Sequence, residues 1–226
     1  MNPFAFPENI HILEHIDRLV EIFNACWPMY AAMPAVLKDA IERSYQKVGW
    51  DLRNSESEKG IFPTFFDLLD ILPGVIEESH YSKDTQSDYV GALCTRVKSL
   101  TNGIYGSVLC AEDALSDAEM FDQNVIVDLS RVGSMETKSL LMGILVMKLQ
   151  EYRMCSSGMN SRLRHVTVLE EAHNLLRKTS AEQSQEGANL QGKSVEMLAN
   201  AIAEMRTYGE GFIISDQAPG CLLYTS

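Results

Sequence analysis

The chain has 226 residues, 46% hydrophobic and 22% charged, which suits one globular domain with a sizeable core or one and a half small domains. Because 31 Asp and Glu outnumber 19 Lys and Arg, the net charge of −12 argues against non-specific nucleic-acid binding over the whole surface. We expect a cytoplasmic protein with no membrane partner and no disulfide or zinc framework, since no apolar run approaches ~20 residues and the five cysteines are scattered.

The first half of the chain carries helical patterns. Apolar residues recur at helical spacing on one face of each segment, and helices are therefore expected over residues 14–27, 34–49, 62–72 and 89–100. Pro34 suits the first turn of the second helix, Gly49 suits its end, and Thr64 is a candidate N-cap for the third. The first half of the chain is thus predicted to be mostly helical.

The second half of the chain changes to strands that alternate with helices. Short β-branched runs predict three core strands, near 124–129, 165–169 and 211–215, and helices are expected over 136–152 and 194–208. This alternation is typical of a parallel sheet in an α/β fold. Ligands bind at the carboxyl ends of such strands, so we expect the polar residues at 128–131, 170–171 and 216–217 to meet at one edge.

The strand near 165–169 ends in two acids, Glu170 and Glu171. An apolar strand with this ending is typical of a Walker B motif, in which one carboxylate holds Mg²⁺ and the next activates the water that attacks a γ-phosphate. An alternative is that both acids begin the following helix, where they favour its dipole. His173 is expected to pack or to support these acids rather than to bind a metal.

A rival interpretation uses the same residues as iron ligands. Residues 170–173 read E-x-x-H, and so do residues 77–80. Two such motifs are half of the ligand set of a di-iron carboxylate bundle, but they should lie in the middle of long helices. We keep the di-iron protein as a remote third hypothesis.

Residues from Gly187 to Ser194 read GANLQGKS and fit the P-loop pattern G-x-x-x-x-G-K-[ST]. A working P-loop needs a buried strand before the first glycine, whereas residues 178–186 are polar. The match also follows the Walker B-like strand instead of preceding it. We interpret it as a decoy, a loop in which Ser194 lies near a helix N-terminus.

Read together, several segments resemble the HerA-like ATP-binding proteins, which are RecA-fold motors of the FtsK/HerA superfamily. The segments are, in chain order, NPFAFP with EHIDRLVEIFNA, MPAVLKDAIERSY, VIVDLSRVGSMETKSLLMGILVMKLQEYR, HVTVLEEAHNLL and AIAEMRTYGEGFIISDQAP. The resemblance covers essentially residues 1–220. Its most specific parts are LEEAH and EMRTYGEGFIISDQ.

The resemblance implies a role for four residues and implies ATP and Mg²⁺ as cofactors. Glu170 corresponds to the Walker B acid that organises Mg²⁺, and Glu171 to the catalytic glutamate that activates water. Gln217 corresponds to a sensor of the γ-phosphate. Arg206, in the E-x-R-x-Y-G block, corresponds to an arginine that reaches the nucleotide of a neighbouring subunit.

Some residues of these segments also have a purely structural interpretation. Arg206 has the spacing of a solvated helix arginine paired with Glu210 four residues on. Asp216 has the position of a residue that only caps the strand end. Arg131 is a weaker candidate for the electrostatic role and is expected to be structural.

The resemblance also implies a domain organisation. In the family the P-loop precedes the NPF segment, so we expect this chain to be a fragment without it. Residues 1–27 would begin the partial ATPase core, 28–120 would form a helical insertion, 121–220 would complete the RecA-like core, and 221–226 would be a non-native tail.

The leading functional expectation is part of a DNA translocase or helicase that hydrolyses ATP as a homohexameric ring. DNA as a partner comes from the resemblance alone, and the fragment by itself is expected to be inactive. The alternative from another class is a nucleotide-independent assembly or interaction protein on a degenerate α/β core.

Overall fold

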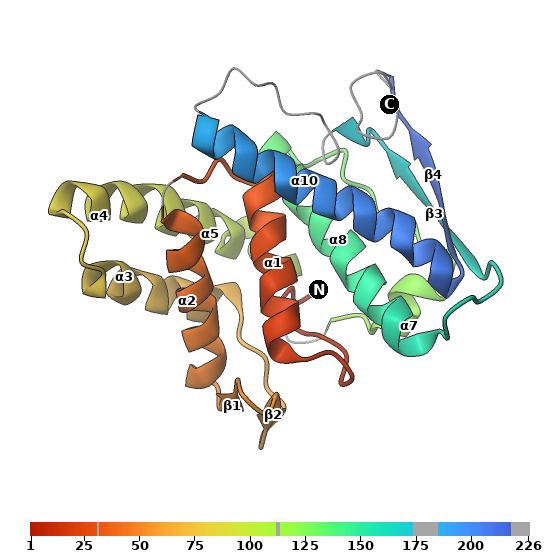
Figure 1. Ribbon diagram of the computed structural model, residues 1–226, viewed down its shortest axis with the longest axis horizontal. Helices are drawn as coiled ribbons and strands as arrows, with labels where there is room; N and C mark the ends of the chain where they lie inside the picture. The colour runs from red at the N-terminus through yellow and green to blue at the C-terminus, as the bar shows by residue number, and fades with distance from the viewer. Residues whose placement is uncertain (31, 112–113, 174–184, 218–226) are drawn as a thin grey trace. The chain divides into compact units, whose positions relative to one another are not determined.

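A computed structural model describes residues 1–30, 32–111, 114–173 and 185–217, and the side chains of residues 185–194 lie outside this description. The chain divides into two compact units. Unit 1 comprises Met1–Val20 and Ala31–Leu115, and unit 2 comprises Glu21–Tyr30 and Ser116–Ser226. Helix α1 (Ile12–Cys26) begins in unit 1 and ends in unit 2, so the chain passes between the units within one helix (Figure 1).

Unit 1 is mainly helical, as its apolar periodicity predicts. Its helices are α2 (Met33–Lys47), α3 (Phe65–Glu78), α4 (Lys83–Tyr89), the π-helix η1 (Val90–Cys94), α5 (Thr95–Thr101) and α6 (Gly103–Leu109). Thr64 is the N-cap of α3: its side chain accepts a hydrogen bond from the Phe66 backbone, and Asp67 accepts one from the Thr64 backbone. The predicted start of this helix is therefore confirmed.

Aromatic side chains fill the interior of unit 1. Phe4, Tyr45 and Phe65 are fully buried, and the ring centroids of Phe4 and Phe65 lie 5.1 Å apart in an edge-to-face arrangement. The Tyr45 hydroxyl donates a hydrogen bond to the Phe4 backbone carbonyl, which satisfies its buried polar atom. The segment before α1 is thus fixed to α2 and α3.

A small hairpin also belongs to unit 1. Strand β1 (Trp50–Asp51) pairs antiparallel with β2 (Glu56–Ser57), with Trp50 opposite Ser57. The sequence indicates only a polar loop in this region, because strands of two residues are too short to show a period. The hairpin follows directly on the end of α2 (Figure 1).

Unit 2 contains a parallel sheet with helices. Its elements after α1 are α7 (Asp117–Phe121), α8 (Met135–Ser156), β3 (His165–Glu170), α10 (Gln185–Met205), the 3₁₀-helix η2 (Arg206–Tyr208) and β4 (Glu210–Ser215). β3 pairs parallel with β4 in a register that runs from His165 opposite Glu210 to Glu170 opposite Ser215. Figure 1 shows α8 and α10 on the same side of this sheet. The α/β class and two of the predicted strands are confirmed.

The third predicted strand, near 124–129, is not a strand in the structure. Val125 and Val127 are exposed, and Ile126 is 95% exposed. A β-branched run becomes a strand only when its backbone groups find a partner, and this segment pairs with no strand among the described residues. The sequence pattern shows the propensity but carries no information about the partner.

Helix α10 begins at Gln185, well before the predicted start at Ser194. The GANLQGKS segment is therefore helical and does not form the loop expected of it. Ala188, Leu190 and Lys193 are residue types with high helix propensity, whereas each of the two glycines of the segment costs about 1 kcal/mol in a helix. Within the described ranges no helix is both long and apolar enough to cross a membrane.

A buried charged cluster ties α8 to the sheet inside unit 2. The Glu210 side chain is 0% exposed, and its carboxylate accepts hydrogen bonds from Arg153 Nε at 2.8 Å and Thr167 Oγ1 at 2.7 Å. His165 Nδ1 lies 2.8 Å from the same carboxylate. Arg153, 5% exposed, also reaches Asp122 at 2.7 Å, so neither buried charge is left alone.

Candidate functional site at the strand ends

The carboxyl ends of β3 and β4 bring two polar pairs together. Glu170 is the last residue of β3 and lies opposite Ser215, the last residue of β4. Glu171 follows β3, and Asp216 and Gln217 follow β4. Two of the three polar strand ends expected at one edge therefore lie side by side. The third, at 128–131, does not follow a strand.

The two acids of the pair have different surroundings. Glu170 is exposed, and within the part of the chain that the structure describes its carboxylate has no hydrogen bond or ion pair. Glu171 Oε2 accepts a hydrogen bond from Lys138 Nζ at 3.3 Å. Lys138 lies near the start of α8, on a helix that the acid-pair motif does not include. One carboxylate is open to a ligand, and the other is held by a cation.

The backbone of Glu171 is in the left-handed region, with φ of 51°. A residue with a Cβ pays about 1 kcal/mol for this conformation. Such strain persists where the surrounding contacts over-determine the backbone, and it is concentrated at functional sites. Because of this turn, Glu171 does not continue the side-chain alternation of β3. The two acids therefore do not simply occupy opposite faces of one strand.

The contacts that hold this turn come from Asp216. Its Oδ2 atom accepts a hydrogen bond from the His173 backbone N–H at 2.7 Å and lies 2.8 Å from His173 Nδ1. The Asp216 side chain is 1% exposed. We call this pair the Asp216–His173 latch. It fixes the segment after β3 to the end of β4, so Asp216 does more than cap its strand.

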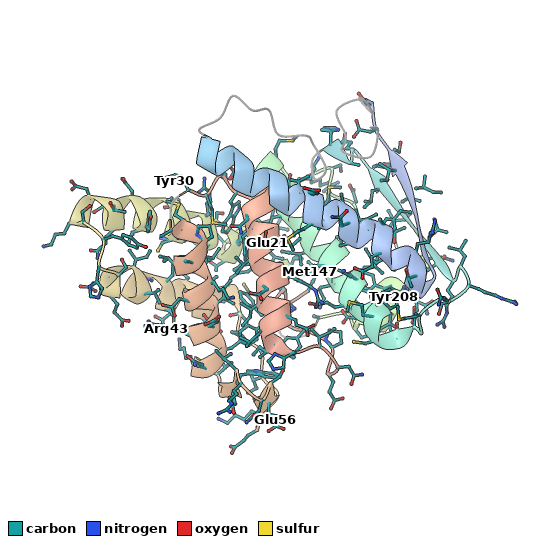
Figure 2. The ribbon with its side chains drawn as sticks, in the orientation of Figure 1. Glu21, Tyr30, Arg43, Glu56, Met147 and Tyr208 are labelled. Atoms are coloured by element: carbon teal, nitrogen blue, oxygen red, sulfur yellow. The ribbon has the colours of Figure 1, made fainter. Side chains whose placement is uncertain are left out.

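Arg206 lies at the other end of the sheet. It belongs to η2, directly before β4, whereas Glu171 and Gln217 lie at the carboxyl end. β4 is six residues long, and at ~3.3 Å per residue its ends lie roughly 16 Å apart. Arg206 is exposed and lines a hollow of about 830 Å³ between α10 and β4. Tyr208, labelled in Figure 2, marks this same turn.

The alternative pairing of Arg206 with Glu210 does not occur. Glu210 is buried and its carboxylate is bound by Arg153, Thr167 and His165. The i, i+4 rule fails here because the helix changes to a 3₁₀ turn at Arg206 and Gly209 then reverses the chain with φ of 82°. The two residues no longer share a helix face.

The remaining candidates are simple to place. Gln217 is exposed beside Asp216, and Arg131 is exposed in a turn. Lys138 is the residue at this edge that sequence reasoning missed. It lies 33 residues before Glu171, in a helix whose pattern gives it no special place, so only the fold reveals it.

The donor set at this edge fits Mg²⁺ better than iron. Within the described ranges no group of three or more His, Cys, Asp and Glu side chains could hold a metal ion, which removes the ligand set of the di-iron hypothesis there. Mg²⁺ is usually held by one or two carboxylates together with waters and substrate phosphates, and the open carboxylate of Glu170 fits that role. Residues 187–194 are helical, and an α-helix uses its interior N–H groups in its own hydrogen bonds.

Comparisons with known proteins agree with the fold. No protein-family model matches the chain, and no curated protein is similar to it in sequence. In structure, the chain is similar to VirB4 of Thermoanaerobacter pseudethanolicus, with a TM-score of 0.64 and 17% sequence identity. The match covers 96% of this chain and 54% of the VirB4 chain, so this chain spans about half the length of that protein. The likeness shows a shared fold and supports a partial RecA-like sheet.

Proposed function

From this shared fold, we propose that the chain is part of the ATPase core of a motor protein of the FtsK/HerA superfamily. The observation that carries the proposal is the register of β3 and β4, which sets the Glu170–Glu171 pair beside Asp216 and Gln217. In the proposal Glu170 holds Mg²⁺, Glu171 is the general base, and Gln217 senses the γ-phosphate. HerA-like DNA translocases or helicases are the finer assignment, and DNA is the proposed substrate.

The geometry suits a division of labour between the two acids. Glu170 has an open carboxylate, as a metal ligand requires. Glu171 is a candidate for the base that accepts a proton from the attacking water. Lys138 orients the carboxylate of Glu171 through its 3.3 Å hydrogen bond, and the Asp216–His173 latch holds the turn after β3 against the end of β4. Precise orientation of this kind is the main contribution that a protein makes to phosphoryl transfer.

The position of Arg206 favours a role between subunits. Since roughly 16 Å separates the two ends of β4, Arg206 lies far from the acid pair of its own chain. In a ring, proposed here as a homohexamer, it would stabilise charge on the nucleotide of a neighbouring subunit. The phosphate loop would come from a part of the longer protein outside these 226 residues.

The proposal is tested in two steps. Genomic DNA directly 5′ of the Met1 codon should encode, in frame, a buried strand followed by G-x-x-x-x-G-K-[ST]. In the longer protein, Glu171→Gln should lower ATP hydrolysis about 100-fold or more while ATP binding is retained, because only the proton acceptor is lost. Glu196→Gln, at an exposed position of α10, is the matched control and should leave hydrolysis unchanged.

Two results would contradict the proposal. One is full hydrolysis by the Glu171→Gln protein, and the other is an upstream sequence with a stop codon and promoter in place of a P-loop. The second result supports the nucleotide-independent assembly protein. Within the proposal, Lys193→Ala leaves ATP hydrolysis by the longer protein unchanged, because the helical GANLQGKS segment takes no part in binding phosphate.

A further inference from the structure

A second hollow, of about 760 Å³, lies in unit 1 against the β1–β2 hairpin. Three aromatic side chains line it, those of Phe6, Trp50 and Phe62. We call it the aromatic hollow. None of its lining residues belongs to the strand ends described above, so it is independent of the proposed ATPase site.

The three rings form one cluster. Trp50 and Phe62 are stacked, with centroids 5.1 Å apart and planes at 25°. Phe6 lies 5.2 Å from each of them. The indole N–H of Trp50 donates to the Ile61 carbonyl at 2.7 Å, which fixes the half-buried ring in the lining of the hollow. Aromatic faces of this kind attract Lys and Arg side chains.

Acidic side chains share the lining of the aromatic hollow. They are Glu8, Asp51, Glu56 and Glu58, and no Lys or Arg among the described residues lines it. Asp51 is engaged in the turn, where it accepts hydrogen bonds from the Arg53 backbone at 2.9 Å and from Asn54 Nδ2 at 2.7 Å. The other three carboxylates have no hydrogen bond or ion pair with any residue that the structure describes. Figure 2 shows Glu56 at the hairpin.

The hairpin beside the aromatic hollow is anchored to its own unit. The Ser55 hydroxyl accepts a hydrogen bond from the Ile12 backbone at 2.9 Å, and the His11 ring lies 3.3 Å from the Arg53 carbonyl. The Gly60 N–H donates to Ser57 Oγ at 3.2 Å. A site that is held in place before binding loses less entropy when a ligand arrives.

We propose that the aromatic hollow docks a basic segment of a partner protein. One Lys or Arg side chain lies over the rings, and further cations of the segment meet Glu8, Glu56 and Glu58. Three separate carboxylates around 760 Å³ suit several cationic groups on one chain better than a single small amine. The acidic lining disfavours the binding of nucleic acid, because its carboxylates would repel the phosphates.

A labelled peptide tests the proposal on the full 226-residue chain. The probe is a fluorescein-labelled peptide of alternating Lys and Arg residues, and a Gly-Ser peptide of equal length is the neutral comparison. We expect fluorescence anisotropy to show binding of the basic peptide only, with weaker binding as salt rises. Glu56→Gln/Glu58→Gln should weaken binding roughly 3- to 10-fold, the range for two exposed ion pairs.

The control variant is Glu77→Gln/Asp88→Asn, which removes the same charge from exposed positions of unit 1 outside the hollow. It should bind the peptide like the unmodified chain. Trp50 supplies a second readout, because the other tryptophan, Trp27, is only 2% exposed. Basic peptide should change the tryptophan emission, and Trp50→Phe should remove that change.

Three results would overturn the proposal. The first is equal weakening in the two double variants, which would mean that the peptide senses only the net charge of the chain. The second is equal binding of the neutral peptide. The third is binding that leaves the emission of Trp50 unchanged, which would place the peptide elsewhere on the acidic surface.

Discussion

Replacement of Glu210 by glutamine tests the buried cluster of unit 2 most directly. The Glu210 side chain is 0% exposed and that of Arg153 is 5% exposed, with 2.8 Å between Oε2 and Nε. Glu210→Gln keeps the shape but removes the negative charge, so among the described residues Arg153 retains Asp122 alone as an ionic partner. Breaking one side of a buried pair costs about 3–5 kcal/mol, because the remaining charge stays desolvated. That is a large share of the ~5–15 kcal/mol by which a typical domain is stable.

Urea denaturation followed by circular dichroism at 222 nm measures this cost. Glu204→Gln, at an exposed position of α10, is the matched control and should change the free energy of unfolding by less than about 0.5 kcal/mol. The double variant Arg153→Met/Glu210→Met should be more stable than Glu210→Gln, because it removes both buried charges of the pair and not just one. A Glu210→Gln protein within 1 kcal/mol (roughly the median worth of an exposed pair) of the unmodified chain would refute the reasoning.

Two further predictions concern the same unit. Gly209→Ala should lower the free energy of unfolding by roughly 1–3 kcal/mol, since φ is 82° there and a Cβ would overlap the Arg162 carbonyl oxygen. Gly158→Ala, where a Cβ meets open space, should cost far less, and equal urea midpoints for the two variants would contradict this account. The Tyr152 hydroxyl, and then Arg153, lower the pKa of Asp122 below its ordinary value. A lowered pKa in the folded state stabilises it above the unfolded pKa of about 3.9, and this stabilisation is lost as pH falls through the folded pKa. Asp122→Asn should therefore flatten the fall in urea midpoint between pH 5 and pH 2, and an unchanged slope would argue against it.

The fold could be predicted from the sequence where the pattern is local. The apolar stripes of α1 to α3, the cap at Thr64 and the alternation of β3 and β4 with helices all follow from spacing and residue type. Partners could not be predicted, and this explains the error at 124–129, where propensity is present without a paired strand. The error at the start of α10 has another cause, because the match to the P-loop pattern led to the expectation of a loop although Ala188, Leu190 and Lys193 have high helix propensity.

The candidate site also has features that the sequence predicts and features that only the fold reveals. The acid pair and its place at a strand end could be predicted because they are neighbours in sequence. Lys138 and the Asp216–His173 latch could not, because 33 and 43 residues separate the interacting groups. The separation of Arg206 from the acids, in contrast, follows from the expected parallel sheet, since Arg206 precedes β4 whereas the acids lie at the end of β3. Chemistry that depends on contacts between distant segments needs the fold.

The division of α1 between two units has a practical consequence for dissecting this protein. Residues 21–30 belong to unit 2 and carry Phe23 and Trp27, which are almost fully buried. A truncated protein that begins at Ser116 would therefore lack part of the interior of unit 2, even though the cut interrupts no helix or strand. Isolated unit 2 would need its ten-residue piece restored, either as an added peptide or by a redesigned connection that joins residue 30 directly to residue 116. A series of terminal deletions designed to find the domain boundary would therefore yield misfolded proteins and not an isolated unit 2.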